Sequence, residues 1–347
     1  MEKIKVGLCS YGMSGKLFHA PFIHLHPGYE LYAAWERSSK VINKDYPLVI
    51  SFSAYEDLLS DPNIELIVIN TPNYTHFDLA KKALYAGKHI VVEKPFCLTT
   101  KECDELIGIA AEMNKKISVY QNRRWDSDFK TVKKILEEGL LGKIAEAEIH
   151  FDRYDQNISY KLHKETPGPG AGILYDLGPH LIDQALQLFG MPESIFADLT
   201  IQRPVSKVDD YMELILFYPG LRVRLKAGYL VREALPSFIF HGQTGSFIKP
   251  RADVQEEMLK QGIMPGIDEW GTEPESGEGI FHTVINGQIV RKKISSEQGN
   301  YYTYFDLLYE ALTENKPMPV TSAAGRHVIH IIEKAYESFA AKGIVEL

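Results

Sequence analysis

The chain has 347 residues, of which 45% are hydrophobic and 24% charged, and its formal net charge is −8. This length suffices for two domains with a core each, and the composition is ordinary for a soluble globular protein. The negative charge argues against nucleic acid and against an anionic membrane surface as partners, because both attract basic proteins.

Three cysteines, Cys9, Cys97 and Cys103, show no paired spacing, which favours reduced thiols over a disulfide framework or a zinc site. The chain starts with Met-Glu-Lys-Ile-Lys and runs straight into an apolar strand, so no secretory signal is expected. No apolar run reaches the roughly 18–20 residues that a membrane helix needs. We therefore expect a cytoplasmic protein.

The first 120 residues alternate short apolar runs with helical patterns. The expected strands are Ile4–Cys9, Tyr29–Trp35, Leu66–Asn70, His89–Glu93 and Ile117–Gln121. The expected helices are Lys16–Leu25, Ala54–Leu59, Phe77–Ala86 and Thr100–Asn114, the last with a capping signal at Thr99 or Thr100 and Glu102. Apolar strands separated by helices predict a parallel sheet that is covered on both faces.

The first strand–helix turn reads Gly7-Leu8-Cys9-Ser10-Tyr11-Gly12-Met13-Ser14-Gly15. Against the pattern G-x-G-x-x-G, Ser10 replaces the first glycine, Gly12 lets the backbone approach a pyrophosphate, and Gly15 allows close helix–strand packing. The N–H groups of Met13 and Ser14 would point at the phosphates. The position between a buried strand and a helix favours a dinucleotide site, and an ordinary glycine-rich loop is the alternative.

The second strand ends at Glu36-Arg37-Ser38, where dinucleotide sites distinguish their cofactors. Glu36 lies about 20 residues after Gly15, where an acid accepts hydrogen bonds from the adenosine ribose and favours NAD. Arg37 and Ser38 could instead hold a 2′-phosphate and favour NADP. A solvated charge pair at a strand end is the structural alternative.

After residue 122 the pattern changes to strands that follow one another without intervening helices. The expected strands are Ile144–Tyr154, Ser194–Arg203, Asp210–Phe217, Arg222–Tyr229, Ser237–His241, Ile280–Val284 and Gln288–Ile294, with hairpin turns at Tyr218-Pro219-Gly220 and Asn286-Gly287. The expected helices are Phe129–Glu138, Pro179–Phe189, Tyr301–Thr313 and Ala323–Lys342, and Gly262–Gly279 is expected to be a surface loop.

The fold class predicted from these patterns is α/β with two domains. Residues 1–121 would form an N-terminal Rossmann domain with a doubly wound parallel sheet. Residues 122–347 would form a C-terminal α+β domain with a large, mainly antiparallel open sheet. The last helix could pack back onto the first domain.

Lys94 directly follows the strand His89–Glu93, and Asp176 and His180 lie four residues apart. Open α/β sheets bind ligands beyond the carboxyl ends of their strands, where Lys94 is placed. Because proline is tolerated in a first helical turn, we expect one helix to start near Asp176 and to carry Asp176 and His180 on one face. Lys94–Pro95 is also a candidate cis peptide bond, which would turn the lysine into the cleft. Together with the dinucleotide turn, this set predicts alcohol–carbonyl oxidoreduction.

The three residues suit the oxidation of an alcohol. His180 would take the proton, since histidine titrates near operating pH. Asp176 would orient the imidazole and stabilise its charged form, or bind a substrate hydroxyl, and Lys94 would stabilise alkoxide charge. Each residue also has a purely structural alternative. His180 could be a structural histidine, Asp176 a helix N-cap and Lys94 a solvated lysine at a strand end.

With these motifs in hand, the chain resembles the Gfo/Idh/MocA oxidoreductases, and within them the branch with NADP-dependent scyllo-inositol dehydrogenase. The resemblance runs over essentially the whole length and is strongest in the segments Tyr11–Pro21, Tyr120–Asp126 and Leu174–Gln184. It implies Lys94, Asp176 and His180 as the catalytic residues. It also implies that the C-terminal domain serves substrate binding and oligomerisation, as homodimers or homotetramers that pair the C-terminal sheets. The resemblance leans toward NADP, although Glu36 beside Arg37 departs from the inositol-oxidising relatives.

The expected ligand contacts extend beyond the catalytic set. The cofactor contacts are Gly12, Met13, Ser14, Gly15, Glu36, Arg37, Ser38, Thr71, Pro72, Asn73, His76, Glu93, Lys94 and Asn122. The substrate contacts are Lys94, Asp176, His180, Arg123, Trp125 and Tyr154, with interdomain packing as the alternative for Arg123, Arg124 and Trp125. No metal site is expected. His19 and His24 are separated by Pro21, which makes it unfavourable for the two histidines to lie on one face of a helix.

We therefore expect an NAD(P)-dependent dehydrogenase that transfers a hydride between nicotinamide and a polyol, inositol or sugar. The expected partner is this small molecule, and neither nucleic acid nor a membrane. The alternatives are a reductase of another aldehyde or ketone and a catalytically silent cofactor-binding sensor. Substrate identity, reaction direction and the choice between NAD and NADP stay open at this stage.

Overall fold

The computed structural model describes residues 3–38, 40–159, 161–251, 253–266 and 268–347. The chain divides into two compact units. Unit 1 comprises Met1–Asn122, Gln255–Trp270 and Tyr301–His327, and unit 2 comprises Arg123–Val254, Gly271–Asn300 and Val328–Leu347. The domain limits 1–121 and 122–347 stay a prediction. Unit 1 contains the predicted first domain and, in addition, two segments from later in the chain.

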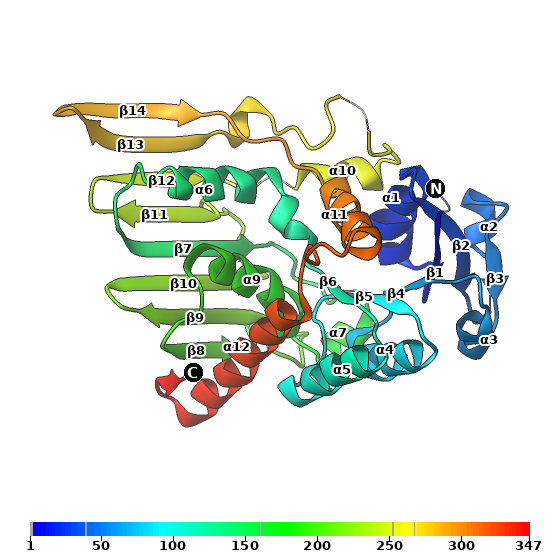
Figure 1. Ribbon diagram of the computed structural model, residues 1–347. Helices are drawn as coiled ribbons and strands as arrows, with labels where there is room; N and C mark the ends of the chain where they lie inside the picture. Colours follow the sequence, from blue (N-terminus) through cyan, green and yellow to red (C-terminus); the bar gives the residue numbers. More distant parts are fainter. Residues whose placement is uncertain (1–2, 39, 160, 252, 267) are drawn as a thin grey trace. The chain divides into compact units, whose positions relative to one another are not determined.

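Unit 1 is built on a parallel sheet with the strand order β3-β2-β1-β4-β5-β6, which is that of the Rossmann fold (Figure 1). Its strands are β1 (Ile4–Leu8), β2 (Tyr29–Trp35), β3 (Ile50–Phe52), β4 (Leu66–Ile69), β5 (His89–Glu93) and β6 (Ile117–Tyr120). Its helical segments are η1 (Gly15–His19), α1 (Ala20–Leu25), α2 (Ile42–Asp45), α3 (Tyr55–Ser60), η2 (Asn73–Thr75), α4 (His76–Tyr85), α5 (Thr100–Glu112) and α11 (Tyr302–Thr313). The helix α10 (Val254–Lys260) lies almost entirely in this unit. The predicted doubly wound parallel sheet is confirmed.

The predicted elements of unit 1 are found within one or two residues of their expected ends. The sequence analysis missed β3, α2, η2 and α10. Three or four residues, as in β3, α2 and η2, are too few to show a hydrophobic period. The helix expected at Lys16–Leu25 begins as the π-helical turn η1 and continues as α1. The capping signal before α5 is confirmed, since the Glu102 N–H donates to Thr99 Oγ1 over 3.2 Å.

Late segments of the chain complete the core of unit 1. The N–H of Val119 on the edge strand β6 donates to the carbonyl oxygen of Val320 over 3.2 Å. Tyr304 on α11 donates through its hydroxyl to Ser118 Oγ over 2.9 Å. Phe305, also on α11, stacks on Phe22 of α1 with 5.2 Å between ring centroids. The edge of β6 is therefore covered by residues that follow it by about 200 positions.

Unit 2 contains a sheet with the order β14-β13-β12-β11-β7-β10-β9-β8-β15, antiparallel except for the pair β7 and β10. Its strands are β7 (Ile144–Asp152), β8 (Ser194–Thr200), β9 (Tyr211–Tyr218), β10 (Leu221–Gly228), β11 (Phe238–Gly242), β12 (Gly245–Lys249), β13 (Gly279–Ile285), β14 (Gln288–Ile294) and β15 (Val345–Glu346). Both predicted hairpins are confirmed by the pairs β9–β10 and β13–β14. The short strands β12 and β15 were not predicted.

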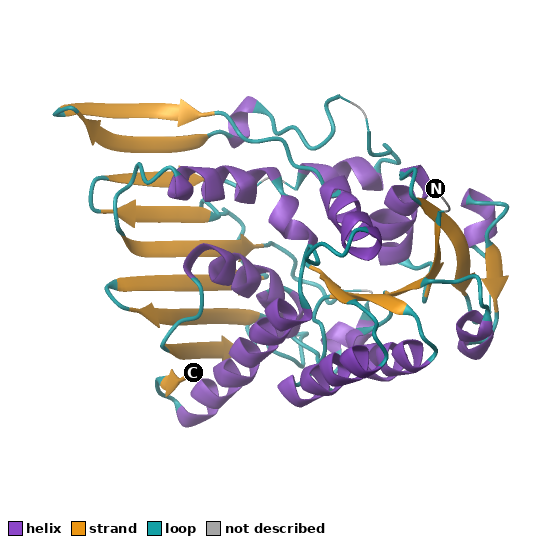
Figure 2. Cartoon of the chain, in the orientation of Figure 1, coloured by secondary structure: helices purple, strands orange, loops and turns teal. Residues whose placement is uncertain are grey.

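Helices cover one face of this sheet, as Figure 2 shows for unit 2. The helical segments are η3 (Asn122–Trp125, which begins in unit 1), α6 (Ser127–Glu137), α7 (Leu162–Glu165), α8 (Ile173–Asp176), α9 (Gly178–Phe189), η4 (Glu275–Gly277) and α12 (Ser322–Ala341, which also begins in unit 1). Helix α9 packs on β7 and β10, and Ser338 of α12 accepts a hydrogen bond from the Ala197 N–H of β8 over 2.9 Å. The predicted large, mainly antiparallel sheet is confirmed.

The segment expected to be a surface loop, Gly262–Gly279, is only partly one; its residue 267 lies outside the described residues. Trp270 is buried, and its indole N–H donates to Gln255 Oε1 over 3.1 Å. An aromatic side chain this large buries enough apolar surface to hold the chain at residue 270 in the core of unit 1. The expectation was wrong at Trp270 because the segment is otherwise rich in glycine, proline and acids.

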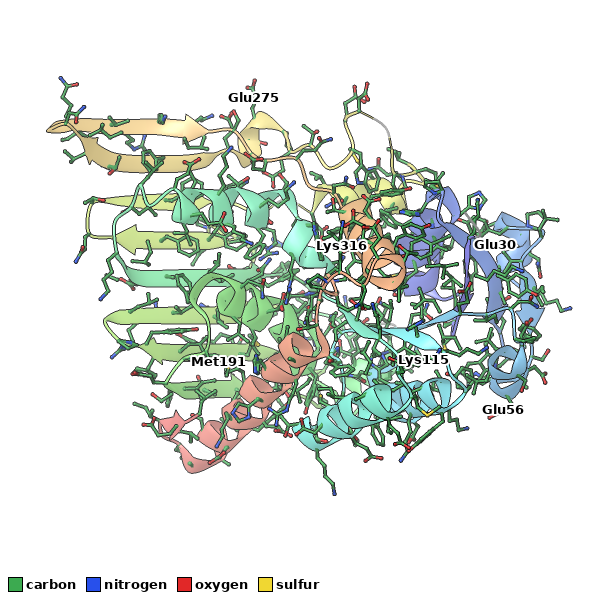
Figure 3. The ribbon with its side chains drawn as sticks, viewed as in Figure 1. Glu30, Glu56, Lys115, Met191, Glu275 and Lys316 are labelled. Carbon is green, nitrogen blue, oxygen red and sulfur yellow. The ribbon has the colours of Figure 1, made fainter. Side chains whose placement is uncertain are left out.

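The surface of both units carries acidic side chains, as expected from the net charge. Glu30 on β2, Glu56 on α3 and Glu275 in η4 are exposed (Figure 3). The three cysteines are free and buried. Every helix among the described residues is too short or too polar to cross a bilayer.

Candidate active site

The turn after β1 has the form that a pyrophosphate requires. The Gly12 N–H donates to Ser10 Oγ over 3.0 Å, and Asn70 Nδ2 donates to the Ser10 carbonyl oxygen over 2.8 Å. A Cβ atom on Gly15 would lie 2.3 Å from that same oxygen, so only glycine fits there. Gly12 and Met13 are exposed, which leaves the backbone of the turn accessible to a phosphate. The turn therefore fits a dinucleotide, with Gly15 in the packing role expected for it.

The other expected cofactor residues of unit 1 follow neighbouring parallel strands. The strand order reverses between β1 and β4, and ligands of doubly wound sheets bind at the carboxyl ends beside this point. Thr71, Pro72 and Asn73 follow β4, Glu93 and Lys94 stand at the end of β5, and Asn122 follows β6. The sheet thus brings these segments to the same edge as the Ser10–Gly15 turn.

Glu93 joins the phosphate turn to the end of β5. Its Oε1 accepts a hydrogen bond from the Ser14 hydroxyl and lies 2.9 Å from His19 Nε2, and its Oε2 accepts the Lys94 N–H over 3.2 Å. Burial alone would raise the pKa of Glu93, but the hydrogen bond and charge of His19, with Ser14 and Lys94, lower this pKa to about 2. Glu93 is therefore ionised and connects the phosphate turn to the end of β5. Its partner His19 was considered in the sequence analysis only as a metal ligand.

The loops after β4 and β5 are joined by His76. The His76 ring nitrogens lie 2.8 Å from the Pro95 carbonyl oxygen and 3.0 Å from that of Thr71. Burial lowers the pKa of His76 despite these carbonyl groups. Its imidazole thus contacts both loops and, when neutral, donates its one N–H to a carbonyl oxygen of one of them. A cofactor contact of this side chain stays a prediction. The Lys94–Pro95 peptide bond is cis, as expected.

At the end of β2, Glu36 is engaged by the protein itself. Its carboxylate accepts the N–H groups of Val41 over 2.8 Å and of Ile42 over 3.3 and 3.4 Å, and the Ser51 hydroxyl over 2.9 Å. The single Ile42 N–H is shared between the two oxygens, so three donors occupy three of the about four acceptor positions of the carboxylate. The next two side chains, Arg37 and Ser38, are exposed.

Asp176 and His180 of unit 2 do not share one continuous helix, which corrects the sequence-based expectation. Asp176 ends the short helix α8, and His180 lies in the first turn of α9, after the junction at Leu177. Pro179 explains the break, since it has no N–H with which to continue the hydrogen-bond ladder of α8. The His180 ring is nearly buried and lies 6.4 Å from the Phe151 ring, between centroids.

The sequence analysis missed one residue beside Asp176. The Lys164 ammonium, from the short helix α7, donates to Asp176 Oδ1. No motif marks Lys164, because it lies 12 residues before Asp176 in a helix of four residues. Only the fold of that segment reveals the pair.

The expected substrate residues of unit 2 have protein partners of their own. Arg123 is buried in ion pairs with Asp126, at 3.1 Å, and Asp253, at 2.7 Å. The Trp125 carbonyl oxygen accepts the Asn300 N–H over 2.9 Å. The Tyr154 ring is 42% exposed and lies 4.5 Å from the Arg232 guanidinium. Tyr154 is the most accessible of the three, and substrate contact by any of them stays a prediction.

Arg124 connects η3 to the helix that carries His180. It forms a two-pronged ion pair with Asp183 of α9, over 2.8 and 2.6 Å. Asp183 lies one turn after His180 on that helix. Planar pairing of guanidinium and carboxylate fixes orientation as well as distance, so Arg124 helps to hold α9.

Comparison with known proteins identifies the family. Residues 4–121 match the NAD-binding Rossmann fold of the Gfo/Idh/MocA oxidoreductase family. Residues 133–347 match the C-terminal alpha/beta domain of the same family. The chain belongs to the Gfo/Idh/MocA oxidoreductase family. It is an oxidoreductase with a nicotinamide dinucleotide as cofactor, and the resemblance read from the sequence is confirmed.

Similar proteins cover the whole chain. The uncharacterised Escherichia coli oxidoreductase YdgJ is 42% identical over 97% of this chain and 96% of its own length. The scyllo-inositol 2-dehydrogenase (NADP(+)) IolW of Bacillus subtilis is 36% identical over 100% of this chain and 97% of its own. The crystal structure of an oxidoreductase from Bacteroides fragilis is 45% identical over 100% of both chains, with a TM-score of 0.91. The oxidoreductase yvaA of B. subtilis superposes with a TM-score of 0.95 at 36% identity, over 100% of this chain and 99% of yvaA.

Glu93→Gln should destabilise the protein at neutral pH and much less in acid. The folded pKa of about 2 lies below the ordinary 4.5. The ionised carboxylate therefore stabilises the fold above about pH 4.5, by roughly 3 kcal/mol, and this contribution disappears as the pH falls from 4.5 to 2. Calorimetric Tm values between pH 8 and pH 3 should show the gap between wild type and variant closing. Glu112→Gln, at an exposed position on α5, is the control; a gap that stays constant would contradict the prediction.

Proposed function

We propose that this oxidoreductase transfers a hydride between nicotinamide and a hydroxyl-bearing carbon of a polyol, inositol or sugar. The placement of Lys94 carries the proposal. Lys94 follows β5 at the edge of the phosphate turn, and the Glu93 carboxylate that accepts its N–H also accepts the Ser14 hydroxyl of that turn. The relative IolW, which acts on scyllo-inositol, supports the class of substrate.

In this proposal the chain's own residues handle the proton and the developing charge. The Lys94 ammonium stabilises negative charge on the substrate oxygen while the hydride leaves the carbon. His180 takes the hydroxyl proton, and Asp176 stabilises the charged imidazole or binds a substrate hydroxyl. When bound, the nicotinamide supplies the hydride acceptor. Run in reverse, the same residues would reduce a ketone.

Lys94→Ala and His180→Ala should each lower kcat for polyol oxidation by roughly 10²–10⁴-fold, the usual contribution of a positioned acid or base. Nicotinamide absorbance, followed with a panel of inositols and sugars, measures the change. The exposed Lys101→Ala and His282→Ala are matched controls. Unchanged turnover in the two test variants would refute the mechanism. A wild type that binds cofactor and oxidises or reduces nothing in the panel would point to a sensor.

We further propose that NADP is preferred over NAD. Glu36, the acid that would bind the ribose hydroxyls, is already hydrogen-bonded to the start of α2 and to Ser51. The neighbouring Arg37 and Ser38 are exposed at the end of β2. A guanidinium pairs well with a phosphate, and this position in the fold is where a 2′-phosphate is held.

Arg37→Ala should weaken NADPH binding by about 10–100-fold, the scale of one hydrogen-bonded charge pair, and should leave NADH binding nearly unchanged. Fluorescence titration with both reduced cofactors measures this, and Arg37→Lys should retain part of the affinity because it keeps the charge. Tight NADH and weak NADPH binding by the wild type would contradict the assignment.

We also propose that two or four copies assemble through the open face of the unit 2 sheet. On β9 every second side chain is buried, whereas Ile215 and Phe217, on the alternate face, are only half-buried. A second sheet would cover this apolar surface. Light scattering should therefore give two or four times the chain mass, and Ile215→Glu with Phe217→Glu should lower it. A monomeric wild type would exclude this assembly.

A further inference from the structure

Three arginine side chains gather around one phenylalanine of β7. The guanidinium carbons of Arg251, Arg153 and Arg123 lie 4.4, 5.0 and 5.2 Å from the centre of the Phe151 ring. A guanidinium is attracted to the face of an aromatic ring, but three like charges around one ring repel each other. The cluster is stabilised where negative charge comes close, whether from the protein or from a ligand.

The protein supplies ion-pair partners to one of the three arginines. Arg123 is buried in ion pairs with two aspartates. In the part of the chain that the structure describes, Arg153 and Arg251 form no ion pair. Asp128 interacts electrostatically with Arg251, but burial raises the pKa of Asp128, so this carboxyl is more easily neutralised than an ordinary aspartate. Arg153 and Arg251 are therefore positive charges beside the ring without a paired acid.

The sheet places Arg153 on the face that also carries His180. Arg153 directly follows β7 and lies two positions after Phe151, so both side chains point to the same face. Asp152 points to the other face, where its Oδ2 lies 3.7 Å from His150 Nδ1. Helix α9 packs on β7, and the ring of its His180 lies 6.4 Å from the Phe151 ring, between centroids.

Arg153 lies close enough to the proposed catalytic residues of unit 2 for one small molecule to reach them together. The distances of 5.0 and 6.4 Å to the Phe151 ring centre add to at most 11.4 Å between the Arg153 guanidinium carbon and the His180 ring centre. Burial raises the pKa of Tyr229 to about 12, the charge of Asp176 adds to this rise, and the charge of Arg153 opposes it. Arg153 and Asp176 thus act on the same hydroxyl group.

The main chain holds Arg153 in place while its side chain stays accessible. The Arg153 N–H donates to the Gly228 carbonyl oxygen, and its carbonyl oxygen accepts the Val231 N–H, each over 2.9 Å. The residue is exposed to solvent. A planar guanidinium pairs with the two oxygens of a carboxylate or a phosphate, so an accessible arginine at this position suits an anionic ligand.

We propose that Arg153 is a specificity-determining residue that binds an anionic group of the substrate, a carboxylate or a phosphate, with the charge of Arg251 in support. The inference rests on the proposed function, in which His180 and Asp176 act on the substrate. It narrows the substrate class from polyols and sugars in general to those that carry an acidic group, such as sugar acids and sugar phosphates.

The test measures kcat/KM for compounds that differ in one group. Glucose, glucuronate and glucose 6-phosphate carry a hydroxymethyl group, a carboxylate and a phosphate on the same ring, and the galactose series and the pair of inositol and inositol phosphate extend the comparison. The wild type should use an anionic member about 10–100-fold better than the neutral one, the scale of one charge-assisted hydrogen bond. The better anion shows whether the group is a carboxylate or a phosphate.

Arg153→Met removes the charge and keeps an apolar chain against the Phe151 ring. It should lower kcat/KM for the anionic member about 10–100-fold, mostly through KM, and leave the neutral member nearly unchanged. Arg153→Lys should restore part of the loss, because it keeps the charge and loses the planar fork. The exposed Arg291→Met, on β14, is the control.

Ionic strength gives a second readout that a purely structural role would not move. Salt screens the attraction between accessible charges. Between about 0.01 M and about 0.15 M salt, KM for the anionic member should rise in the wild type and in Arg291→Met, and much less in Arg153→Met.

The outcomes separate the inference from the function on which it rests. A wild type that shows no preference for the anionic member of any series would overturn the inference. Equal losses on neutral and anionic members in Arg153→Met would make Arg153 a structural residue, with the same consequence. A wild type that acts on no member of any series, with either nicotinamide cofactor, would instead overturn the proposed function itself.

Discussion

The hydrogen bonds of the Glu93 carboxylate are the interaction on which the arrangement of unit 1 depends. A buried carboxylate needs partners, and Glu93 takes them from the phosphate turn, from the π-helical turn behind it and from the backbone of Lys94. The dinucleotide turn and the end of β5 are consequently placed as one piece. Parallel strands end at a common edge of the sheet. At this edge the Glu93 side chain fixes the position of the phosphate turn relative to Lys94.

The sequence was a good guide wherever an element is long and regular. The bounds of β2, β5 and β14 agree with those expected, since their apolar runs end at clear turn or polar signals. The sequence failed where one residue interrupts a pattern or a segment is short. Pro179 divides the expected helix around Asp176 and His180, and α2 and β3 are too brief to show a period.

The same limit applies to the candidate site, where side-chain partners decide what a motif residue can do. Glu36 stands where dinucleotide sites distinguish their cofactors, and the family resemblance marks Asp176 as catalytic. The carboxylate of Glu36 accepts two backbone N–H groups and the Ser51 hydroxyl, whereas that of Asp176 accepts the Lys164 ammonium. These partners could not be read from spacing, because they lie in or beside elements too short to show a hydrophobic period. Motifs therefore predict which residues carry the site, and the contacts show which partners the protein itself supplies to them.

The late segments that complete unit 1 bear on how the protein is made. The edge strand β6 obtains partners from Val320 and Tyr304, and Phe22 of α1 its stacking partner from α11. A ribosome produces the dinucleotide-binding sheet first and these partners only when the chain is nearly finished. During synthesis β6 is thus an unpaired edge strand, and Phe22 lacks its stacking partner. Unpaired strand edges and exposed apolar side chains promote association with other chains. The N-terminal unit is therefore expected to reach its native state only after translation has passed most of the second unit.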